Sequence, residues 1–98
     1  LAAQDESFRQ RSYEMIGRCL LEEGRFEEAA SELTQALAFS ALEPEVAIGV
    51  RFQLGIALEA AGRPQEALVE FEHVFEVQAN YPDVAVKIRD LRKHLEAA

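Results

Sequence analysis

The chain has 98 residues and a mass of 11.0 kDa, which excludes two domains of ordinary size. Apolar residues make up 49% of it and charged residues 29%, a composition typical of globular and not of disordered proteins. A net charge of −8 would repel a phosphate backbone, so we expect no nucleic-acid binding.

Apolar residues recur at helical spacing along nearly the whole chain, which predicts an all-α protein without strands. Gly24 and Gly62 are expected to end helices, because glycine readily adopts the left-handed conformation that closes them. Pro44, Pro64 and Pro82 suit the first turns of helices, where the missing N–H group costs nothing. The expected helices cover residues 7–23, 26–39, 44–60, 64–77 and 83–96.

The first two helices and the next two are copies of one repeat. Glycine in mid-helix costs about 1 kcal/mol relative to alanine, so Gly17 and Gly55 predict a close crossing of the two helices in each pair. Gly24 and Gly62 are expected to make the tight turn between them. A shift of 38 residues superposes eight positions: Ile16 on Leu54, Gly17 on Gly55, Leu20 on Leu58, Gly24 on Gly62, Glu28 on Glu66, Ala29 on Ala67, Leu33 on Phe71 and Ala36 on Val74.

The two units resemble the tetratricopeptide repeat over about residues 10–80. Their sequences are YEMIGRCLLEEGRFEEAASELTQAL and RFQLGIALEAAGRPQEALVEFEHVF. The resemblance implies a right-handed α-solenoid of two antiparallel helix hairpins with a fifth, capping helix. We expect one domain over residues 1–98, as a fragment of a longer protein, with repeat 1 at about 7–39, repeat 2 at about 44–78 and the cap at about 82–96.

Three features depart from the family pattern. Arg51 stands where the family prefers a large aromatic residue, and Ala79 stands where it favours proline. The shift of 38 residues exceeds the family period of about 34. We expect the extra residues to lengthen the connection around residues 40–47.

No residue pattern supports catalysis, so we expect a protein that is not an enzyme and holds no cofactor. His73 and His94 lie on different helices without further ligands at metal-binding spacing, so no metal site is expected. Cys19 is expected to be a small packed thiol on the buried side of the first helix. The many glutamates occupy outward helical positions and are expected to be solvated.

Three apolar residues lie opposite the core stripes of their own helices: Phe52 and Ile56 on the third helix and Val86 on the fifth. We expect them to be exposed in an isolated monomer. In tetratricopeptide arrays, such outward positions of the first helix in each pair line a concave groove that binds peptides. The resemblance assigns to this groove Arg11, Glu14, Arg18, Glu22, Phe52, Ile56, Glu59, Val86, Asp90 and Lys93.

The resemblance therefore implies a non-catalytic protein-interaction module that binds a peptide or helix of a partner in its concave groove. Two alternatives stay open: self-association into a homo-oligomer such as a homodimer, or a regulatory appendage of a larger enzyme or sensor. The longest apolar run is four residues, so no membrane interaction is expected. Cys19 is the single cysteine, which makes a reducing, cytoplasmic location the simplest expectation.

Overall fold

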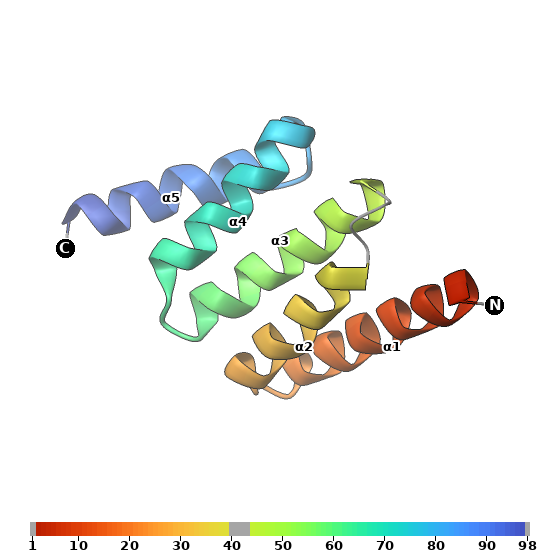
Figure 1. The fold of residues 1–98 in the computed structure, drawn as a ribbon. Coiled ribbons are helices and arrows are strands. Elements are labelled where there is room, and N and C mark those ends of the chain that lie inside the picture. The colour runs from red at the N-terminus through yellow and green to blue at the C-terminus, as the bar shows by residue number, and fades with distance from the viewer. Residues whose placement is uncertain (1, 40–43, 98) are drawn as a thin grey trace.

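The computed structural model describes residues 2–39 and 44–97, with the side chains of residues 9, 11–38 and 44–97. Helices make up nearly all of these ranges, which contain no strand, so the all-α prediction is confirmed. Figure 1 shows two helical hairpins in succession and a last helix beyond the second. The helices are α1 (Ala2–Glu22), α2 (Phe26–Phe39), α3 (Pro44–Ala60), α4 (Pro64–Val77) and α5 (Val84–Ala97).

The bounds of α2, α3 and α4 agree with the prediction, whereas α1 begins five residues earlier than expected. Alanine has the highest helix propensity, so the alanines at positions 2 and 3 favour this earlier start. Helix α5 begins one residue late because Asp83 has a φ of 67° and is not helical. The predicted lengthening of the connection falls on residues 40–43, outside the described part of the chain, since the helix has already begun at Pro44.

Both hairpin turns close in the same way. Gly24 and Gly62 have φ values of 79° and 81°, the left-handed conformation that their residue type permits. After Gly24, the N–H group of Arg25 donates to the carbonyl of Leu20 at 2.9 Å, and Arg63 does the same to Leu58 at 2.9 Å. Each glycine N–H group also donates at 3.1 Å, Gly24 to the carbonyl of Leu21 and Gly62 to that of Glu59. The two bonds at each turn together form the Schellman motif, which ends a helix at glycine.

The close helix crossings expected at Gly17 and Gly55 are present. A Cβ atom placed on Gly17 would lie 2.7 Å from Cγ of Leu33, and one on Gly55 would lie 2.7 Å from Cε1 of Phe71. Each glycine therefore lets the second helix of its hairpin approach the first.

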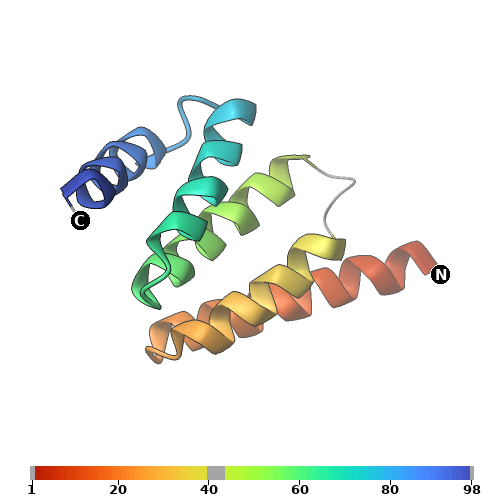
Figure 2. The same ribbon diagram turned by 60° about the vertical axis from the view of Figure 1, so that its left-hand side comes forward.

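The fully buried apolar core is built from α2 to α5, and Figure 2 shows these helices stacked along one direction with α1 at one edge. The molecule is correspondingly elongated, with extents of 50 × 28 × 17 Å. Among the described side chains the core contains Ala29, Ala30, Leu33, Ala36, Ile48, Val50, Leu54, Ala57, Leu58, Ala67, Phe71, Val74, Val84, Ile88 and Leu91.

The prediction that Cys19 is packed is wrong, because its side chain is exposed. Ile16 on the same helix is also 47% exposed. No other part of the described chain therefore covers these two side chains completely.

Candidate functional site

The residues assigned to the groove lie on the first helix of each pair, α1 and α3, and on α5. We call them the groove surface. Five of its charged residues are exposed, namely Arg11, Arg18 and Glu22 on α1 and Asp90 and Lys93 on α5. Glu14 and Glu59 are partly buried.

The central apolar part of the groove surface is more buried than expected. The ring of Phe52 meets the ring of Phe71 edge to face, with centroids 5.3 Å apart, and that of Tyr81 at 5.1 Å. Phe52 and Ile56 are both partly buried against the core, so the prediction that they are exposed and lack intramolecular neighbours is wrong. Val86 is 46% exposed, as expected.

The burial of Phe52 follows from the connection between α4 and α5. Tyr81 returns from this connection to α3, where its hydroxyl oxygen would lie 3.9 Å from a Cβ atom placed on Gly49. Gly49 precedes Phe52 by nearly one helical turn and leaves space for the tyrosine. A small residue one turn before an outward aromatic residue is a signal of such packing that the sequence analysis did not use.

An ion pair joins the groove-facing edges of α3 and α5. Nζ of Lys87 lies 3.3 Å from Oε1 of Glu59, and both side chains are about one-third exposed. This pair links α3 to α5, and the contact of Phe52 with Tyr81 links α3 to the connection that leads into α5. We call Phe52 and Ile56, the apolar centre of the groove surface, the platform.

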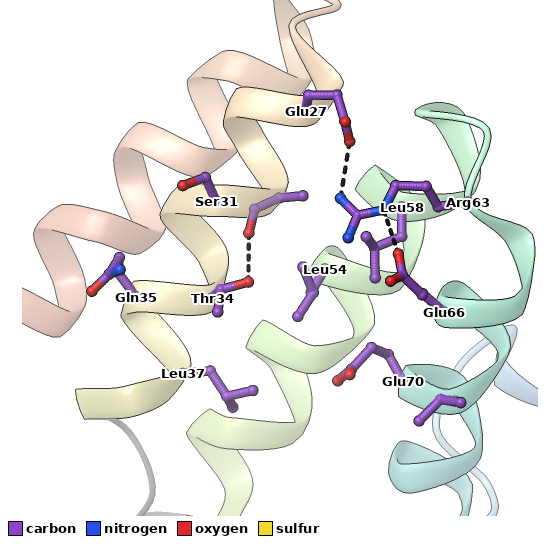
Figure 3. Close-up of a pocket in the computed structure, with 12 residues that line it drawn as sticks. Glu27, Ser31, Thr34, Gln35, Leu37, Leu54, Leu58, Arg63, Glu66 and Glu70 are labelled. Atoms are coloured by element: carbon purple, nitrogen blue, oxygen red, sulfur yellow. Dashed lines mark hydrogen bonds and ion pairs between the residues drawn. The ribbon is translucent and has the colours of Figure 1, made fainter.

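A cleft elsewhere in the structure contains none of the predicted site residues. It is a cleft of about 540 Å³ between α2 and α4, with α3 as its floor (Figure 3). Leu54 and Leu58 lie at its base, and the half-exposed Val69 contributes to the α4 side. Sequence reasoning missed this cleft because residues from three helices form it, and no spacing within one helix reveals it.

Arginines neutralise the acidic walls of the cleft. Nη1 of Arg63 lies 3.0 Å from Oε1 of Glu27 on α2, and its Nε donates to Glu66 on α4 (Figure 3). The hydrogen bond with Glu66, followed by that with Glu27, raises the pKa of the Arg63 guanidinium above its ordinary value. Nη1 of Arg51 donates to Oε1 of Glu70 at 3.0 Å. The carboxylates of Glu27, Glu66 and Glu70 that line the cleft are therefore all ion-paired with arginines.

Two kinds of feature are absent from the part of the chain that the structure describes. No group of three or more His, Cys, Asp and Glu side chains there is arranged to hold a metal ion. None of its helices combines the length and the apolar character needed to cross a bilayer.

Comparison with known proteins places these features in a family. A family model described as tetratricopeptide repeat matches residues 20–89, from the C-terminal end of α1 into α5. Neither the curated proteins nor the solved structures gave a match. The matched region includes both glycine turns and the close crossing at Gly55, the features that define the two hairpins. On its sequence and its helical architecture, the chain belongs to the tetratricopeptide repeat family.

Proposed function

We propose that this chain is a non-catalytic module that binds a peptide or a helix of a partner protein across its groove surface. Tetratricopeptide repeats generally mediate protein–protein interaction. We further propose that residues 7–39 and 44–78 act as two repeats of one domain, with α5 as its cap.

The observation that carries the proposal is the character of the outward side of α3. An outward helical position usually holds a charged residue, yet here Phe52 and Ile56 form an apolar platform. Val86 on α5, which is also assigned to the groove surface, adds a half-exposed apolar side chain. When a partner segment places an apolar side chain here, each Å² of apolar surface removed from water contributes about 25 cal/mol of favourable free energy.

The charged ends of the groove surface suggest the partner's composition. Arg11 and Arg18 lie with Glu14 and Glu22 on α1, so that end carries both signs. Asp90 and Lys93 on α5 also carry both signs. We expect a partner with an apolar anchor flanked by charges of mixed sign, whose ion pairs orient the complex more than they add affinity.

The platform is ordered before binding, which favours affinity. Phe52 is held between Phe71 and Tyr81, and Lys87 is held by Glu59. A partner therefore does not have to immobilise these side chains, each of which would otherwise cost about 0.5 to 1.5 kcal/mol.

Selection of peptides from a random displayed library, followed by affinity measurement on variants, tests the proposal. Val86→Asp should weaken the selected peptides about tenfold or more, because it places a charge in the apolar contact. Val69→Asp is the matched control, since Val69 is similarly exposed at 50% but lines the cleft between α2 and α4. Weakening by Val69→Asp with no effect of Val86→Asp would move the binding site to the cleft and contradict the proposal.

Self-association is a second candidate, supported by the exposed edge of α1 that carries Ile16 and Cys19. A role as a regulatory appendage of a larger protein remains a further proposal. Self-association is compatible with groove binding, because the edge of α1 and the groove surface lie on different sides of that helix.

A further inference from the structure

Helix α1 carries an apolar stripe that the two corresponding helices bury. The α1 stripe consists of Ser12, Ile16 and Cys19; Ile16 is 47% exposed and Cys19 is exposed, and Met15 beside the stripe is 66% exposed. A shift of 38 residues takes Ser12, Ile16 and Cys19 to Val50, Leu54 and Ala57 in α3, and a further shift of 34 leads to Val84, Ile88 and Leu91 in α5. These six counterparts are all at most 7% exposed. Of the three helices, α1 alone leaves this face uncovered.

The ends of the α1 stripe distinguish it from an ordinary contact between repeats. Arg9 and Glu23 continue the stripe, since residues 9, 12, 16, 19 and 23 follow the alternating spacing of three and four that keeps side chains on one helix face. Both charged residues are exposed. Their counterparts in α3 are Ala47 and Ala61, small residues that fit against the preceding hairpin. A preceding hairpin on α1 would instead have to cover two charges, the cation Arg9 and the anion Glu23, which also pairs with Arg25 at 3.4 Å. Burying charged groups is costly.

The two end charges complement each other when the stripe meets a copy of itself in the opposite direction. If Ile16 faces Ile16 across a two-fold axis, residue 9 faces residue 23 at both ends of the contact. Arg9 then meets the partner subunit's Glu23, and the partner subunit's Arg9 meets Glu23. The 14 residues between them correspond to about 21 Å of helix, over which only uncharged residues lie on the contact line.

We infer that α1 binds α1 of a second copy of this chain, antiparallel, about a two-fold axis at Ile16. An isologous contact of this kind closes into a dimer and leaves no free copy of the surface. The groove surface lies on the opposite side of α1 and stays open in both copies. The inference deepens the second candidate, self-association, and does not depend on peptide binding at the groove surface.

One other observation favours this closed dimer over a head-to-tail filament. At the opposite end of the molecule, α5 presents the exposed charged residues Arg89, Arg92 and Lys93, of which Arg89 pairs with Asp90 and Arg92 pairs with Glu72. A head-to-tail contact would place these charged side chains, and not an apolar stripe, against Ile16.

Sedimentation velocity of the whole chain over a wide concentration range tests the contact. We expect a monomer–dimer equilibrium whose dissociation constant rises about tenfold or more with Ile16→Glu. Circular dichroism should show that this variant keeps its fold, because the wild-type side chain is already half exposed. Val77→Glu is the matched control, since Val77 is 61% exposed on α4, and it should leave the dimer unchanged. A monomer at all concentrations, a dimer insensitive to Ile16→Glu, or species that grow beyond a dimer would overturn the inference.

Charge exchange tests the register. Arg9→Glu and Glu23→Arg should each weaken the dimer, because each places like charges opposite one another, and the double variant should restore it. Ile16→Cys in a Cys19→Ser background should form a disulfide-linked dimer under mild oxidation. Wild-type Cys19 should not, because the antiparallel register separates the two thiols by about 9 Å along the helices. Failure of the double variant to rescue, or cross-linking through Cys19 instead, would rule out this two-fold arrangement.

Discussion

Gly17 and Gly55 set the distance between the two helices of each hairpin. A Cβ atom on either glycine would come within 2.8 Å of two atoms of Leu33 or Phe71. Both of these partners are completely buried, so they have no free space into which to move. The helix tolerates the loss of about 1 kcal/mol at each glycine because the close crossing buries Leu33 and Phe71 more completely.

Gly55→Ala should therefore lower the free energy of unfolding by about 1 to 3 kcal/mol, the usual range for overpacking a core. The aromatic ring of Phe71 is rigid and cannot bend away from the added methyl group. Urea unfolding followed by circular dichroism would measure the change.

Gly49→Ala is the control for this substitution within the same helix. Its Cβ atom would meet only the Tyr81 hydroxyl at 3.9 Å, an ordinary contact. It should raise stability by about 0.5 to 1 kcal/mol through helix propensity. Equal effects of the two substitutions would contradict the crossing argument.

Arg51 replaces the aromatic residue that the family prefers at its position, and it pairs with Glu70 at 3.0 Å. The side chains of the pair are 31% and 18% exposed, less than those of the Arg25–Glu28 pair at 53% and 57%. Arg51→Ala should cost about 1 to 2 kcal/mol, between the values for exposed and buried ion pairs. Arg25→Ala, as the control, should cost less, because both side chains of its pair are exposed to solvent. A larger loss in the Arg25 variant, measured by urea unfolding, would refute this ranking.

At the scale of the helices, local signals were sufficient for most boundaries. The helix ends at Gly24 and Gly62 and the helix starts at Pro44 and Pro64 depend on the backbone conformation of these residues themselves. The sequence alone therefore predicts them. The groove surface was harder to predict. Whether Phe52 is exposed depends on Tyr81, which lies 29 residues away and reaches it through a connection whose path has no sequence signature.

The same distinction explains the misplaced Cys19. Periodicity correctly put Ile16 and Cys19 on one face of α1 and showed that this face is apolar. It could not show whether another helix covers the face, because covering is a property of the neighbouring elements. The equivalent face of α3 is buried only because a preceding hairpin is present.

Helix α5 completes the second hairpin by covering its open side. It buries Val84, Ile88 and Leu91, and Arg92 binds Glu72 of α4 at 2.8 Å. Deletion of residues 82–98 should cause aggregation or loss of cooperative unfolding, because terminal repeats need a polar outer face. Leu91→Ala is the milder variant and should cost about 2 to 5 kcal/mol. A soluble monomer of residues 1–81 with unchanged stability would show that α5 is not a cap.

We propose that the molecule has two separate surfaces for contact with proteins. The groove surface combines an apolar platform with charges of both signs, whereas the α1 stripe is apolar and has opposite charges at its two ends. Because the two lie on different sides of α1, a dimer formed through the stripe would present two grooves. The architecture is thus compatible with a scaffold that binds two partner segments at once.

The central claim is that the groove surface, and not the cleft between α2 and α4, is the partner site. Backbone NMR chemical-shift mapping with a library-selected peptide tests it most directly. The account predicts that the largest shifts cluster on the outward faces of α1, α3 and α5, around Ile56, Val86 and Asp90. Shifts concentrated on the cleft, around Ser31, Thr34 and Val69, would contradict it.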